Sequence, residues 1–172
     1  MPNFYAKPYL LANTICMKHF QTALLFIFLS LNGFAQQAYS SESFNIKSGA
    51  PTDWVSYLDY PDFKIEFKFS ACDPPSGLDN ESVLFRFTNK TNESMSLHWH
   101  LLLSYDEVCR TCAYPEEYGY ELSLDPNQVL EGDCASEGNY RLKVFSKFID
   151  AFHAKGAQLT DFKLADFTVT KI

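Results

Sequence analysis

The side chains best able to do chemistry in this chain of 172 residues are its cysteines and histidines. Four of the five cysteines, Cys72, Cys109, Cys112 and Cys134, lie in its alternating apolar part. They support three alternatives: two disulfides with the pairing left open, a four-thiolate zinc site of which Cys-x-x-Cys is one half, or a redox-active Cys109-Arg110-Thr111-Cys112. A redox pair normally stands at a helix N-terminus that lowers the thiol pKa, and no helical pattern follows Cys112.

The histidines suggest a second kind of chemistry. His98 and His100 flank Trp99 in a stretch of alternating apolar residues. If Trp99 faces the core, both imidazoles project from the same outer face, because successive side chains of a strand point to opposite sides. Imidazoles spaced in this way can chelate copper or zinc, and His153 in a later loop is a third candidate ligand. The alternative is that all three histidines are simply solvated.

A predicted secretory signal peptide favours disulfides among the cysteine alternatives. Lys18 follows Met17, an apolar run covers residues 23–31, and Gly33-Phe34-Ala35 is a small-x-small cleavage site. The run is too short to span a bilayer. We therefore predict a signal peptide at 17–35 and a mature chain that begins near Gln36. The Ala-Gln-Gln junction resembles those of exported Bacteroidota proteins.

Residues 1–16 precede an internal start at Met17, and we expect them to be an upstream extension that is not part of the fold. Removing residues 1–35 discards Cys16, so an even number of cysteines enters an oxidising compartment, where disulfides are favoured over a zinc site or a redox pair. It also discards Lys7 and Lys18. The mature chain then has 12 basic and 21 acidic residues, a net charge of −9 against −7 for the whole sequence. Such a charge disfavours binding to nucleic acids or anionic membranes.

The remaining sequence alternates apolar and polar residues with a period of two, which is typical of half-buried strands. Residues 36 to about 49 are Ser-rich and are predicted to be a mobile leader, and residues 52–60 can add a short helical turn or an extra strand. Leu164 and Phe167 are apolar but three residues apart, which breaks the period of two in the last stretch and indicates a bulge near Ala165-Asp166. The predicted strands cover residues 63–71, 82–89, 95–105, 118–124, 128–133, 140–149 and 159–171.

Seven strands at this spacing predict an all-β, antiparallel sandwich over residues 61–172. The run Gly138-Asn139-Tyr140-Arg141-Leu142-Lys143-Val144 resembles the start of strand F of immunoglobulin-like domains, and Trp99 resembles their core tryptophan. The resemblance covers residues 63–172 and concerns the fold alone. It implies that the strand at 140–149 pairs with the strand at 95–105, which would bring His153 near the other two histidines.

If each strand reverses direction, strand counting places all four cysteines at one end of the sandwich. The sequence contains no phosphate-binding loop, Gly-x-Ser-x-Gly elbow or metalloprotease helix. Tyr114 is the best candidate for an exposed aromatic that could stack on a sugar. We therefore expect an exported, non-enzymatic binding or structural module with a protein or glycan partner and no cofactor. The alternative is a small copper- or zinc-binding protein that uses His98, His100 and His153.

Overall fold

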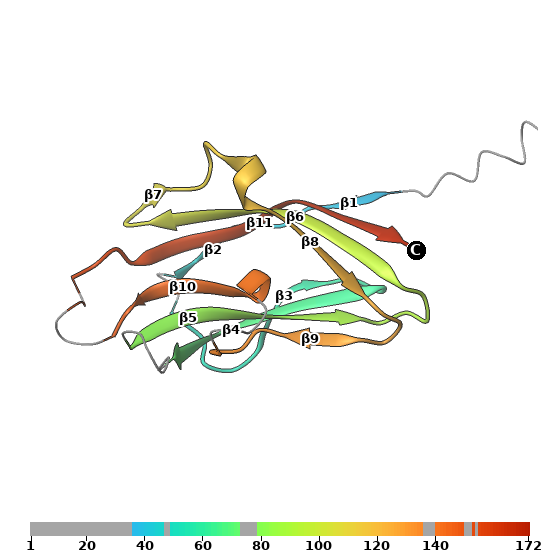
Figure 1. Ribbon diagram of the computed structural model, residues 1–172, viewed down its shortest axis with the longest axis horizontal. Helices are drawn as coiled ribbons and strands as arrows, with labels where there is room; N and C mark the ends of the chain where they lie inside the picture. Colours follow the sequence, from blue (N-terminus) through green and yellow to red (C-terminus); the bar gives the residue numbers. More distant parts are fainter. Residues whose placement is uncertain (1–35, 47–48, 73–78, 136–139, 150–152, 154) are drawn as a thin grey trace, which may run out of the picture. The chain divides into compact units, whose positions relative to one another are not determined.

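The computed structural model describes residues 36–46, 49–72, 79–135, 140–149, 153 and 155–172. The chain divides into two units, Met1–Phe34 and Ala35–Ile172, and the described residues belong to the second. The predicted extension at 1–16 and the predicted signal peptide at 17–35 lie outside the described residues. The described part is all-β, with two antiparallel sheets that form a sandwich (Figure 1).

The first sheet is built on the long pairing between β6 and β11. The remaining strands of this sheet pair with one or the other: β1 and β2 with β11, and β7 and β8 with β6. Their bounds are β1 Gln37–Tyr39, β2 Phe44–Asn45, β6 Met95–Tyr105, β7 Val108–Cys109, β8 Gly119–Leu124 and β11 Leu159–Lys171. A short 3-10 helix, Pro115–Tyr118, leads into β8.

The second sheet has the order β10-β5-β4-β3, and β9 pairs with β5 beside β10. Its strands are β3 Val55–Asp59, β4 Phe63–Cys72, β5 Asn80–Asn89, β9 Val129–Glu131 and β10 Lys143–Phe148. A 3-10 turn, Tyr140–Leu142, precedes β10. Strand β3 is therefore an edge strand of this sheet.

Aromatic side chains from the two sheets meet in the core. Phe87 stacks on Trp99 with ring centroids 5.1 Å apart, and Phe67 meets Phe162 edge to face at the same separation. All four rings are almost completely buried. Burying such a side chain contributes about 2 to 3 kcal/mol, so the alternation of apolar residues determines which face of each sheet points inward.

All seven predicted strands are present, and four short strands, β1, β2, β3 and β7, accompany them in the described part. The register of β11 shifts between Ala165 and Thr168, and Asp166 has a φ of 51°, which confirms the predicted bulge. The extra strand in residues 52–60 is β3. The Ser-rich stretch differs from the predicted mobile leader, because β1 and β2 pair with β11 there.

One predicted pairing is wrong. Strand β10 pairs with β5 rather than β6, and both β9 and β10 run antiparallel to β5. The chain therefore does not reverse between them. Gly132 explains this course, because its N–H donates to the Phe85 carbonyl and its Cα lies directly against the backbone of Leu142. The chain thus leaves β5 at Gly132, beside Phe85, and pairs with it again at Lys143, beside Leu84.

Candidate binding groove

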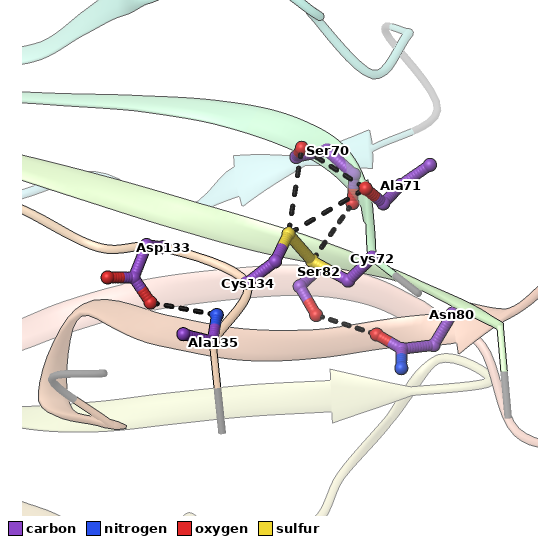
Figure 2. Close-up of a disulfide and its surroundings, with 8 residues drawn as sticks. All are labelled: Ser70, Ala71, Cys72, Asn80, Ser82, Asp133, Cys134 and Ala135. Carbon is purple, nitrogen blue, oxygen red and sulfur yellow. Dashed lines mark hydrogen bonds between the residues drawn. A yellow bond between two sulfur atoms is a disulfide. The ribbon is translucent and has the colours of Figure 1, made fainter. Parts of the chain in front are cut away.

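The two disulfides predicted by the cysteine count are formed, and the structure supplies their pairing. Cys72 at the end of β4 bonds to Cys134, with a Cα–Cα distance of 5.3 Å (Figure 2). The Cys134 sulfur lies 3.9 Å from the Ser70 hydroxyl and 3.7 Å from the Ala71 carbonyl oxygen. This bond fastens the excursion after Gly132 to the end of β4.

The second disulfide joins Cys109 of β7 to Cys112, with Cα atoms 5.7 Å apart. Cys109 lies opposite Ser104 near the end of β6. The neighbouring Tyr105 hydroxyl donates to the Phe145 carbonyl at 2.6 Å, which joins this end of β6 to β10. Tyr114, predicted to be an exposed aromatic, is 56 % exposed just after this loop.

The structure separates the three candidate metal ligands. The rings of His98 and His100 lie 5.2 Å apart on the outer face of β6, and the Asp166 carboxylate is 3.0 Å from Nδ1 of His100. His153 lies in the connection between β10 and β11. This connection ends beside Tyr105 of β6, because Leu159, the first residue of β11, pairs with Tyr105. Tyr105 is seven residues, or about 23 Å, from His98 along the strand. Among the described residues, no group of three or more His, Cys, Asp or Glu side chains is arranged to hold a metal.

A groove of about 910 Å³ lies between the chain that enters β2 and the edge strand β3. One wall is formed by Ser40 and residues 42–44 and the other by residues 55–58, and residues 49–51 together with Phe67 complete the lining. The first wall leads into β2 in one sheet and the second is β3 of the other sheet. The groove therefore lies along the side of the sandwich, where two sheet edges face each other.

Tyrosine hydroxyls fix the two walls relative to each other. The Tyr57 hydroxyl donates to the Glu42 carbonyl oxygen at 2.6 Å and accepts from the Leu164 N–H at 3.2 Å. The Tyr60 hydroxyl donates to the Ser40 carbonyl oxygen at 3.3 Å. Burial raises the pKa of Tyr57, so its hydroxyl keeps its proton and this bond at neutral pH. The groove is thus held open by contacts that need no ligand.

The lining combines apolar surface with a polar rim. Phe44, Val55, Leu58 and Phe67 supply the apolar surface, and serine hydroxyls together with Glu42 supply the polar groups. Binding sites with this character bury apolar groups of a ligand and orient it through a few polar contacts. Glu42 adds a negative charge to a chain that is already acidic, which favours a neutral or basic ligand over an acidic one.

The position of β3 indicates how a ligand could lie in this groove. The lining includes four consecutive residues of β3, from Val55 to Leu58. A register shift between Ser56 and Leu58 interrupts the alternation of this strand. Exposed Ser56 and buried Leu58 both line the groove, so the groove follows the edge of β3 rather than one of its faces. A strand edge presents backbone N–H and C=O groups with which an extended segment can pair.

The sequence alone does not reveal this groove. It predicts a mobile leader for the first wall and leaves the conformation of the second wall open. Tyr57 and Tyr60, with their alternating spacing to Val55 and Leu58, were the available signal, but their hydrogen bonds reach residues that are distant in the sequence.

No protein-family model, curated protein or solved structure matches this chain. Within the described ranges, no helix is long and apolar enough to cross a membrane. The functional assignment therefore rests on the geometry of the groove itself.

Proposed function

We propose that this chain is an exported, non-enzymatic binding module that captures an extended segment of a partner protein along the edge of β3. The observation that carries the proposal is the groove, which combines an edge strand with an apolar surface and a fixed opposite wall. Export is supported by the signal-peptide pattern at 17–35 and by two disulfides, which persist in oxidising compartments.

The partner segment is expected to be extended and to carry apolar side chains at alternate positions. In strand addition, backbone hydrogen bonds supply affinity and pockets for every second side chain supply specificity. The apolar lining from Phe44 and Val55 provides such a pocket, and the carboxylate of Glu42 disfavours acidic segments. We therefore expect a protein partner rather than a glycan, because the edge of β3 offers backbone groups with which an extended segment can pair.

Random peptides displayed on phage provide a direct test. Ser56 is an exposed residue of β3 that lines the groove, so Ser56→Trp fills the groove without altering the core. Ser123 is an exposed serine of β8 in the other sheet, and Ser123→Trp is the matched control. We expect enriched peptides with alternating apolar residues, which Ser56→Trp no longer binds and Ser123→Trp still does.

Two outcomes would contradict this function. One is the absence of any enriched peptide, and the other is binding that survives Ser56→Trp. Binding to an immobilised glycan that Ser56→Trp abolishes would overturn the peptide assignment and show that the groove recognises sugars.

A second candidate function uses the outer face of β6. The adjacent rings of His98 and His100 offer two imidazole donors for copper or zinc on this face. Calorimetric titration with copper and zinc tests this alternative. The metal-binding function requires that the wild-type protein binds copper or zinc with micromolar affinity and that the His98→Ala/His100→Ala variant does not. It is eliminated if the wild-type protein binds neither metal or if the variant binds equally well.

A further inference from the structure

The disulfide between Cys109 and Cys112 is placed very differently from the other one. Cys112 is exposed and Cys109 is half-buried, whereas in the other disulfide Cys134 is half-buried and Cys72 is only 4 % exposed. An incoming thiolate must approach one sulfur along the axis of the bond, so exposure controls which disulfide can exchange. The Cys109–Cys112 bond meets this requirement through Cys112.

The loop that carries this disulfide is anchored by groups other than its sulfurs. Thr111 is only 2 % exposed, and its hydroxyl accepts from the Leu103 N–H and donates to the Leu101 carbonyl, both at 2.9 Å. The Arg110 N–H also donates to the Leu103 carbonyl at 2.8 Å. These bonds attach the loop to the edge of β6 whether the disulfide is closed or open. Opening it therefore leaves the two sulfurs close together and the sandwich intact.

The same loop prepares one sulfur to leave as a thiolate. The Cys112 N–H donates to the Cys109 sulfur at 3.2 Å. A hydrogen bond from a backbone N–H favours the charged form of the sulfur that accepts it, and the neighbouring Arg110 adds a positive charge in the sequence. Cys109 is thus the better leaving group, and Cys112 is the more accessible sulfur for attack.

We propose that Cys109–Cys112 is a site of thiol–disulfide exchange with dithiols of exported proteins. A partner thiolate attacks the Cys112 sulfur, and the electron pair of the S–S bond passes to Cys109. The second partner thiolate then attacks the partner's own sulfur in the mixed disulfide and releases Cys112 as a thiolate. The partner loses two electrons and two protons and gains a disulfide. Cys109 and Cys112 take up the two electrons, and the two protons pass to the solvent or to their thiolates.

The surface around this site suits contact with an unfolded partner. Val108 is 52 % exposed and Tyr114 is 56 % exposed, and the two residues flank the disulfide loop in the sequence. These two side chains provide apolar surface beside the disulfide that an extended, still reduced segment of a partner can contact. The exchange site is independent of the groove along β3, so each proposal can fail without the other.

The two disulfides of the native protein can be compared in one experiment. The folded protein is exposed to reduced glutathione, quenched with acid, alkylated and mapped by mass spectrometry, while circular dichroism follows the fold. We expect Cys109 and Cys112 to become labelled at least about tenfold faster than Cys72 and Cys134, with the β-sheet signal unchanged. Equal rates, or labelling only when the sheet signal is lost, would overturn the proposal.

A transfer experiment tests the exchange itself. A synthetic peptide with two reduced cysteines is mixed with the oxidised protein without oxygen, and its oxidised form is quantified. We expect transfer of one disulfide per protein molecule, lost in Cys109→Ala/Cys112→Ala and retained in Cys72→Ala/Cys134→Ala. Failure of the peptide to become oxidised, or transfer that survives Cys109→Ala/Cys112→Ala, contradicts the assignment.

Discussion

Removing the disulfide between Cys72 and Cys134 should destabilise the fold much more than removing the one between Cys109 and Cys112. The two bonds close loops of very different lengths, with sequence separations of 62 and 3. The loss of chain entropy in the unfolded state gives a stabilisation of about 4 kcal/mol for the longer loop and about 2 kcal/mol for the shorter one. The larger value is a major part of the roughly 5 to 15 kcal/mol of net stability of a domain.

The surroundings of the two disulfides also make removal of Cys72–Cys134 the more destabilising change. Cys72 is buried beside Ser70 and Ala71, so its truncation also removes packing. The loop closed by the shorter bond stays attached to β6 through Thr111. The difference between the two effects is therefore expected to be at least about 2 kcal/mol.

Urea unfolding of the two double alanine variants measures this difference, with Trp99 in the core as the fluorescent probe. The Cys72→Ala/Cys134→Ala variant should have a much lower urea midpoint than the Cys109→Ala/Cys112→Ala variant. If the free energy of unfolding falls with urea concentration at a similar slope in both variants, their unfolded states are comparable. Equal midpoints, or a lower midpoint for Cys109→Ala/Cys112→Ala, would refute the argument from loop length.

Three further predictions concern single residues. Burial alone would raise the pKa of Glu66, but its ion pairs with Lys64 at 2.7 Å and Arg86 at 2.6 Å hold that pKa below its usual value. The stabilisation of the fold by these ion pairs is therefore present above about pH 4.5 and is lost as pH falls through the lower folded-state pKa. Glu66→Gln should cost about 2 kcal/mol at pH 7 and flatten the acid branch of the stability curve, whereas an unchanged acid branch would contradict this role. Burial raises the pKa of Tyr105 to about 12, so its contribution to stability is complete below pH 10 and is lost as pH rises from 10 to 12. Tyr105→Phe removes the hydrogen bond to Phe145 and should cost about 1 kcal/mol at pH 7. It should also weaken the loss of stability that urea unfolding measures between pH 10 and 12. A Cβ on Gly132 would meet the Leu142 carbonyl oxygen, whereas one on Gly119 would meet a carbon of the His100 ring at 3.3 Å. Gly132→Ala should therefore lower stability by about 3 kcal/mol and Gly119→Ala by much less. Equal shifts of the thermal midpoint in the two variants would contradict the close approach of Gly132 to Leu142.

The strands could be predicted from sequence because each has one buried face. Phe63, Ile65 and Phe67 alternate with polar residues, and this pattern depends only on the strand itself and its burial. The bulge could be predicted for the same reason, since Leu164 and Phe167 both face the core only if the phase shifts between them. The presence of disulfides followed from the even cysteine count and the predicted export.

The features that were not predicted depend on contacts between distant residues. The pairing of β10 with β5 depends on the close approach of Gly132 to Leu142, which the alternation of residues 140–149 does not reveal. The separation of His153 from His98 follows from that pairing. The Ser-rich stretch forms β1 and β2 because the long edge of β11 accepts them, although their own sequence has little strand character.

The most direct test of the binding function is hydrogen exchange at the backbone amides of β3, measured with and without a peptide enriched from the display library. Strand addition predicts slower exchange within Val55–Asp59 when the peptide is bound, because new hydrogen bonds form along this edge. The amides of β8 should exchange at the same rate in both states. A bound peptide that leaves the exchange of β3 unchanged would contradict the proposal that the groove along β3 is the binding site.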